Sequence, residues 1–367
     1  MIDTRNYVPI LRWKEAERNA LAQLPGNHSA FLTPLIELVP DNFIHVDKKG
    51  HTTKLNNTVV TNKVAAQIFQ SWDGRPFFLD LYNLPKEILS PGSNHPLFLL
   101  GQYASNLGLR LVPVIGIDRD HDYTSAVVAV LGMFRQGACV RLTITDVTRP
   151  DLSQALRSVI STLKLGFEDI DLLIDYQIIE SNAPTLDVVS GLIPNLHEWR
   201  SFIVAGGAFP KDLSDLAKNQ KHILPRTDWV NWRNQVTSKI PLLRVPIYGD
   251  YSIQHAKYSR HIGHLRYSAS IRYTTDENWI IMRGEDVFNP NGPRFKQYPD
   301  WAILLCNLPE YCGENYSSGD KYIKDMSLQS AVTGDASSWL QAGINHHMTF
   351  VVRQLANLFG PSIAASP

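Results

Sequence analysis

The stretch RLVPVIGID, residues Arg110–Asp118, has the composition of a strand that is buried on both faces and ends on a polar residue. CVRLTITD (Cys139–Asp146) and DLLIDYQ (Asp171–Gln177) repeat this pattern, and segments with apolar residues at helical spacing separate the three runs. Near-continuous apolar strands that alternate with helices are typical of a parallel sheet covered on both faces. The three runs therefore predict an α/β protein.

Four further runs of the same kind bring the number of predicted strands to seven, and they are Pro34–Pro40, Pro76–Tyr82, Ser201–Phe209 and Leu242–Tyr248. An eighth strand is expected from Ala269–Gly284, where two strand-like pieces flank a turn signal. Eight strands favour a closed (β/α)8 barrel of the TIM-barrel type, which typically takes ~250 residues. The alternative is an open doubly wound sheet, but no G-x-G-x-x-G follows the first predicted strand.

The C-terminal part of the chain has a different pattern. Residues 295–367 contain two helix-like segments, DWAILLCNLPEYC and SWLQAGINHHMTFVVRQLANLF, with no apolar strand between them. We therefore predict that residues 1–294 form the barrel and that residues 295–367 form a C-terminal helical cap packed on it.

Charge is balanced in this chain of 367 residues, with 35 Lys and Arg against 35 Asp and Glu. Such a balance provides no overall field for general nucleic-acid binding or for an anionic membrane surface. The longest apolar runs, such as AVVAVLGMF, are too short to span a bilayer, and the N-terminus has no apolar core of signal-peptide length. We expect a cytoplasmic protein with no membrane association.

Acidic residues stand at the ends of the first five predicted strands, and they are Glu37, Asp80, Asp118, Asp146 and Asp175. In a barrel the carboxyl ends of the strands open onto one mouth, so these side chains are expected to lie together. Such a cluster suits a divalent metal, Mg²⁺ or Mn²⁺, or an acid/base pair. Helix capping is the favoured explanation for Asp118 and Asp146. Asp80 and Asp175, with Glu37, are the predicted catalytic residues.

Arginines within apolar strand-like runs supply the complementary charge. Arg244 lies in the seventh predicted strand, Arg272 in SIRYT and Arg283 in IMRGE. An arginine keeps its proton inside a protein, so each needs a carboxylate or a ligand oxyanion. Two interpretations stay open: salt bridges to the acidic ring, or bidentate binding of the phosphate or carboxylate of a small anionic ligand.

The segment Gly249–Ser268 follows the seventh predicted strand and is rich in Tyr, His and other polar residues. A loop of about 20 residues is uncommon unless it is functional or disordered, and this composition suits a lid over a polar ligand. His261 and His264 lack further Cys or His support, which disfavours a zinc site. Besides the three arginines, the predicted substrate-binding residues are Tyr248, Asp250, His255 and His347, although a packing role is the alternative for His347.

Several segments together resemble the Beta protein family of bacteria and phages. They are YVPILRWKEAERNAL, TPLIELVP, RVPIYGDYSIQH, IRYT, MRGE, YSSGDKYI and NHHMTFVVRQL, and they are spread between Tyr7 and Leu358. The resemblance carries over no catalytic residue. Members of the family occur in phage genomes and in mobile or defence-related loci, so the resemblance implies a role in phage–host conflict.

Two functions fit these observations. The first is a hydrolase that acts on a phosphoester or a nucleotide-derived anion through Asp80 and Asp175. The alternative is a non-catalytic binding module that pairs its acids with its arginines and recognises a protein partner encoded nearby. The sequence does not separate them, because both require charged side chains at the barrel mouth.

Overall fold

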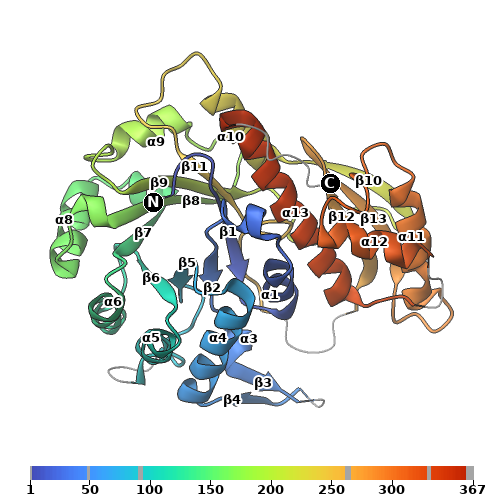
Figure 1. The fold of residues 1–367 in the computed structure, drawn as a ribbon, viewed down its shortest axis with the longest axis horizontal. Helices are drawn as coiled ribbons and strands as arrows, with labels where there is room; N and C mark the ends of the chain where they lie inside the picture. Colours follow the sequence, from blue (N-terminus) through green and yellow to red (C-terminus); the bar gives the residue numbers. More distant parts are fainter. Residues whose placement is uncertain (1, 48–49, 90–93, 261–265, 329–331, 361–367) are drawn as a thin grey trace.

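The computed structural model describes residues 2–47, 50–89, 94–260, 266–328 and 332–360. Its centre is a closed barrel with the strand order β1-β11-β9-β8-β7-β6-β5-β2, in which every neighbouring pair is parallel (Figure 1). This confirms the predicted (β/α)8 fold class. The barrel strands are β1 (Tyr7–Arg12), β2 (Leu35–Glu37), β5 (Pro76–Asp80), β6 (Arg110–Ile115), β7 (Ala138–Thr143), β8 (Ile170–Ile178), β9 (Ser201–Gly207) and β11 (Ile247–Asp250).

Helices connect the barrel strands and cover their outer face (Figure 1). Asn56 and Asp120 cap two of them, because each side chain accepts a hydrogen bond from a backbone N–H in the first helical turn. The helices of this part are α1 (Glu15–Ala22), α2 (Gly26–Ser29), α3 (Pro40–Phe43), α4 (Asn57–Trp72), α5 (Pro96–Asn106), α6 (His121–Phe134), α7 (Ile144–Val147), α8 (Leu152–Leu163), the 3-10 helix Phe167–Asp169, α9 (Leu186–Leu192) and α10 (Thr227–Val236). A small hairpin, β3 (Ile44–Val46) and β4 (Thr52–Lys54), precedes α4.

The eighth barrel strand is β1 at the N-terminus, so its prediction from Ala269–Gly284 is wrong. That segment instead forms the hairpin of β12 (Ser268–Thr274) and β13 (Asn278–Asp286), which joins β10 (Gln220–Pro225) in a separate antiparallel sheet. Pro9 lies inside β1, and a proline within a run counts against a central strand. In the barrel, β1 pairs with β11 through Tyr7–Pro9 and with β2 through Ile10–Arg12, so Pro9 lies at the point where the pairing changes from one neighbour to the other.

The hairpin resembles barrel strands in sequence because both of its faces are covered. Ile271, Ile280 and Met282 pack in the core beneath the C-terminal helices. Trp279 and Ile281, on the opposite face, belong to the large core between the barrel and its helices. Burial on both faces removes the polar alternation that marks an antiparallel strand.

Three helices complete the chain: α11 (Gln297–Cys306), α12 (Ser318–Leu328) and α13 (Ala336–Phe359), preceded by the 3-10 helix Arg294–Lys296. The long helix α13 packs on α1 and β1 of the barrel and on β12 and α12 (Figure 1). The boundary predicted between residues 294 and 295 stays a prediction. Across the described ranges, no helix combines the length and the apolar composition that a membrane span requires.

Candidate functional site

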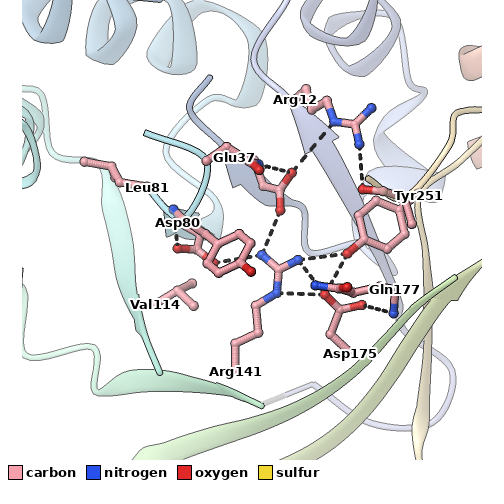
Figure 2. Close-up of polar contacts among 12 residues, drawn as sticks. Arg12, Glu37, Asp80, Leu81, Val114, Arg141, Asp175, Gln177 and Tyr251 are labelled. Carbon is pink, nitrogen blue, oxygen red and sulfur yellow. Dashed lines mark hydrogen bonds and ion pairs between the residues drawn. The ribbon is translucent and has the colours of Figure 1, made fainter. Parts of the chain in front are cut away.

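The barrel interior changes from apolar to charged along the strands. Alternate strand residues point inward, and the lower layers are apolar, with Val8, Phe78, Leu173 and Ile203 among them. The last inward positions, at the carboxyl ends, carry charged or polar side chains instead. These side chains belong to Arg12, Glu37, Asp80, Arg141, Asp175 and Tyr251, and Figure 2 shows them gathered at the mouth.

Arg141 lies at the centre of this group (Figure 2). Its Nη1 donates to Glu37 Oε1 at 2.7 Å and to Asp80 Oδ2 at 2.8 Å. Its Nε and Nη2 donate to Asp175 Oδ2 at 3.1 and 2.7 Å, and Nη2 also donates to the Tyr251 hydroxyl at 2.9 Å. A guanidinium has five N–H donors, and all five are used here.

Two further guanidiniums balance the remaining charge of the three carboxylates. Arg119 Nη2 donates to Asp80 Oδ1 at 2.9 Å, and Arg12 Nε lies 3.9 Å from Glu37 Oε2. Three cations therefore face three carboxylates. We call Arg12, Glu37, Asp80, Arg119, Arg141, Asp175 and Tyr251 the mouth cluster.

The pKa shifts in the mouth cluster keep Asp80 and Arg141 charged and Tyr251 protonated. Burial by itself raises the pKa of Asp80, but Arg119 and Arg141 outweigh it and bring the pKa below its ordinary value. Burial lowers the pKa of Arg141, yet the surrounding hydroxyl and carboxylates raise it well above the ordinary arginine value. The pKa of Tyr251 is raised well above its ordinary value by burial and by Asp175. Asp80 and Arg141 are thus held as an ion pair, and Tyr251 keeps its proton.

The segment after β11 closes the mouth from above. Tyr251 and Ile253 are buried, and Tyr251 also donates to Asp175 Oδ2 at 2.7 Å. Arg12 Nη2 donates to the carbonyl oxygens of His255 and Ala256 at 2.7 Å each, which fixes the segment over β1. Residues 251–253 of the predicted lid are therefore packed into the barrel, whereas Lys257, Ser259 and Arg266 are exposed. His261 and His264 lie outside the described residues.

A cavity of about 390 Å³ opens beside the mouth cluster, next to Arg119, Arg141 and Asp175. Asp146 lines it and accepts bonds from the Thr143 N–H and hydroxyl at 2.7 Å each in a capping box of α7, in which Thr143, and not Asp146, is the N-cap residue. The capping prediction for Asp118 is wrong, since Asp120 caps α6 and Asp118 pairs with Arg149 at 3.1 Å. Within the described ranges, no three His, Cys, Asp or Glu side chains are grouped as a metal ion would require.

The three predicted substrate-binding arginines do not reach the mouth. Arg244 precedes β11 and donates to the carbonyl oxygens of Leu196, Trp199 and Arg200 at 3.0, 2.6 and 3.2 Å. Arg272 and Arg283 belong to the β12–β13 hairpin and line a separate cavity. None of the three forms an ion pair with an acid in the described part of the chain.

Tyr248, Asp250 and His347 also lie away from the mouth. Tyr248 and Asp250 point outward from β11, toward α10 and α13. Asp250 accepts a hydrogen bond from the Tyr7 hydroxyl, and His347 Nε2 lies 3.0 Å from Asp250 Oδ2. Burial lowers the pKa of His347, so its ring is neutral; Nε2–H donates to Asp250, and Nδ1 accepts from the Thr274 hydroxyl at 2.8 Å. His347 therefore has a structural role within the fold, which was the alternative interpretation of this residue.

His255, the remaining predicted ligand residue, is half-buried in the segment that closes the mouth. Its carbonyl oxygen accepts from Arg12, and its Nδ1 accepts from the Lys257 N–H at 3.4 Å. Burial lowers the pKa of His255, followed by the nearby Arg12 charge. His255 thus lies above the mouth cluster, and its ring is not directed at the three carboxylates by any hydrogen bond.

A comparison with protein families finds that the family model described as Beta protein matches residues 7–353. The chain belongs to the Beta protein family. Comparison with the curated proteins finds no match. The match covers the barrel strands, the second sheet and most of α13, so the Beta protein family unit comprises both parts of this structure.

Four of the segments that resemble the Beta protein family contact one another where the barrel meets the C-terminal helices. GDY supplies Asp250, IRYT supplies Thr274, and NHHMT supplies His346 and His347. His346 Nδ1 lies 2.8 Å from Asp320 Oδ2 in YSSGDKYI, and its Nε2 lies 2.8 Å from the Thr274 carbonyl oxygen. Both partners are acceptors, so the ring donates from both nitrogens. These motif residues are buried and bind one another.

Arg141, Arg12, Arg119 and Tyr251 are the members of the mouth cluster that the sequence analysis did not identify. Arg141 lies within the apolar run CVRLTITD, which is the same kind of signal that drew attention to Arg244. Applied to every strand, that signal would have included Arg141.

Proposed function

We propose that this protein acts by binding and that its barrel mouth is a structural ion-pair cluster. The observation that carries the proposal is the complete use of the five Arg141 N–H donors by Glu37, Asp80, Asp175 and Tyr251. A carboxylate that serves as a metal ligand or a general base must have an oxygen free for the metal or the proton. To free the three acids, Arg141 would have to leave its partners, and an unpaired buried charge costs roughly 3–5 kcal/mol.

The exposed apolar side chains of this protein favour another protein as its binding partner. Ile240, Leu243 and Val245, in the loop that joins α10 to β11, have exposed fractions of 62%, 57% and 37%. Val188 and Leu192 are exposed one helical turn apart on α9, and Arg244 ties the loop to the residues after α9. Neighbouring exposed apolar side chains favour contact with another protein. The resemblance-based role in phage–host conflict and a partner encoded nearby belong to this proposal.

Co-elution with the product of the adjacent gene in size-exclusion chromatography tests the partner. Leu243→Asp should abolish the complex, because it places a charge in the apolar patch. Val59→Asp is the matched control, since Val59 is 67% exposed on α4 and lies outside this loop and α9. Complex formation that is equal in the two variants would contradict this surface.

Hydrolysis is the second candidate function, and the 390 Å³ cavity beside Asp175, Arg119 and Lys86 is the observation in its favour. The purified protein is incubated with bis(p-nitrophenyl) phosphate or nucleoside triphosphates in the presence of Mg²⁺ or Mn²⁺. The binding proposal predicts equal background release by the wild type and Asp175→Asn. Metal-dependent turnover that disappears in a folded Asp175→Asn variant would establish the hydrolase instead.

A further inference from the structure

A second cavity, of about 570 Å³, lies between the β12–β13 hairpin, the loop that follows β9 and the beginning of α13. Four of its lining side chains are cationic: Lys211, Arg266, Arg272 and Arg283. Its volume lies within the range of small-molecule sites, about 300–1,000 Å³. The charge of the lining residues is therefore the feature that requires an explanation.

Arg283 is buried without a full set of partners. It lies in β13, its exposed fraction is 8%, and its Nη1 donates to the carbonyl oxygen of Leu216. Its Nε is buried and has no hydrogen-bond partner among the residues that the structure describes. A buried donor that lacks an acceptor destabilises the folded state, the more so when the group is charged. A ligand oxyanion would supply the missing acceptor.

Arg272 lies on the adjacent strand, β12, and is half-buried. Its Nη1 donates to the carbonyl oxygen of Ile253 at 2.8 Å, and its Cζ lies 4.7 Å from the centre of the Phe209 ring. Burial lowers the pKa of Arg272 to about 10, which still leaves the group charged at neutral pH. In the described part of the molecule, neither Arg272 nor Arg283 has a carboxylate within 4 Å, whereas Arg141 has three.

Few carboxylates lie close to the cavity. Asp212, which also lines the cavity, accepts hydrogen bonds from the backbone N–H and the hydroxyl of Ser214. Asp286 lies 3.6 Å from Arg266 Nε, and Asp335 caps α13 through the Ser338 N–H. Hydrogen bonds from Ser214 lower the pKa of exposed Asp212, and the charges of Lys211 and Arg283 lower it further. Among the described residues, three cationic side chains, Lys211, Arg272 and Arg283, therefore face one lining carboxylate.

Aromatic side chains also line the cavity. Tyr267, Tyr298 and Trp339 are among its lining residues. Tyr298 and Trp339 stack with 5.0 Å between their ring centres and are each 1% exposed, whereas Tyr267 is half-buried. Aromatic side chains stack on nucleobases, and each such contact is worth roughly 1–3 kcal/mol. Cationic and aromatic side chains in one cavity match a ligand that joins phosphate groups to a flat ring.

We propose that this cavity is a nucleotide-binding site, in which Arg272 and Arg283 bind the phosphate groups and the half-buried ring of Tyr267 receives the base. Each guanidinium offers planar N–H pairs that match phosphate oxygens bidentately. Lys211, at the exposed rim, adds a third positive charge. The lining of this site shares no residue with the mouth cluster or with the exposed apolar residues of α9 and of the loop that joins α10 to β11.

Isothermal titration calorimetry of the full-length protein with ATP, tripolyphosphate and adenosine, in EDTA and ~0.15 M salt, tests the proposal. ATP should bind at least tenfold more tightly than either fragment. Arg283→Met and Arg272→Met should each weaken ATP binding at least tenfold while the melting temperature stays equal or rises, because an uncompensated charge is removed. Lys211→Met, at an exposed position, should weaken it about threefold, since only a rim charge is lost.

Arg244→Met is the matched control, because Arg244 is another arginine bonded only to carbonyl oxygens and it does not line the cavity. It should leave ATP binding unchanged. The proposal is overturned if ATP does not bind, if tripolyphosphate binds as tightly as ATP, or if Lys211→Met and Arg283→Met both bind ATP like Arg244→Met.

Discussion

Replacing Asp80 by Asn keeps the volume of the side chain and removes one charge from the mouth cluster. Asp80 is 0% exposed and accepts from Arg141 Nη1 at 2.8 Å and from Arg119 Nη2 at 2.9 Å. The Asn amide has a single acceptor oxygen, so its NH₂ group must face one of the two guanidiniums. Loss of one partner of a buried ion pair costs roughly 3–5 kcal/mol.

This cost converts into a measurable fall in melting temperature. With an unfolding entropy of about 2.1 cal/mol/K per residue, a chain of this length loses about 4–6 °C for ~3–5 kcal/mol. Asp175→Asn should behave in the same way, because Asp175 accepts three hydrogen bonds from Arg141 and Tyr251. Differential scanning calorimetry at pH 7 measures both variants against the wild type.

Asp118→Asn is the matched control for this prediction. Asp118 follows barrel strand β6, which ends at Ile115, but its side chain is 74% exposed and pairs with Arg149 in solvent. Exposed pairs contribute little to stability, so its melting temperature should equal that of the wild type. If Asp80→Asn and Asp175→Asn also melt like the wild type, the mouth cluster does not stabilise the fold and the reasoning fails.

Three further predictions concern pH and packing. The folded pKa of Asp80 lies below the unfolded value of 3.8, so the stabilisation by its carboxylate is complete above pH 3.8 and is lost as the pH falls below it. The melting temperature of the wild type should therefore exceed that of Asp80→Asn by less below pH 4 than at pH 7. A difference that stays constant with pH would mean that Asp80 is unpaired. Burial and a neighbouring carboxylate raise the pKa of Asp228 to about 7, so the folded state holds a proton that the unfolded state releases and stability falls as pH rises from 4 to 7. Asp228→Asn should then raise the melting temperature at pH 8 more than at pH 5, and equal shifts would refute this. A Cβ added at Gly319 would lie 2.1 Å from a backbone oxygen of α13, so Gly319→Ala should destabilise the protein by roughly 1–3 kcal/mol in urea unfolding. Gly132→Ala, which meets nothing within 4 Å in α6, should stabilise it by about 0.5–1 kcal/mol, and a similar loss in both variants would contradict the packing of α12 on α13.

The carboxylates of the mouth cluster were predictable because parallel strands in register bring their ends together. Glu37 and Asp80 are partners across β2 and β5, and Thr143 and Asp175 are partners across β7 and β8. The position of an acid at the end of an apolar run therefore fixes where its side chain lies once the barrel closes. The same argument places Arg141, two residues before Thr143, inside the barrel.

The partners of the charged residues were not predictable from local sequence. Arg141 and Arg272 both follow apolar residues in a strand, yet one meets three carboxylates and the other meets none within 4 Å in the described residues. The difference arises because the hairpin that carries Arg272 leaves the barrel for a second sheet. The partners of His347 were likewise not predictable, because they depend on how α13 packs against β1, and that packing joins distant parts of the chain.

The most direct test of the mouth cluster as a structural ion-pair cluster is a crystal structure of the protein soaked in Mn²⁺, with anomalous scattering recorded above the manganese edge. The account predicts no manganese peak among Glu37, Asp80 and Asp175, and continuous density from the Arg141 guanidinium to all three carboxylates. A manganese peak held by two or more of these carboxylates, with Arg141 displaced from them, would contradict it.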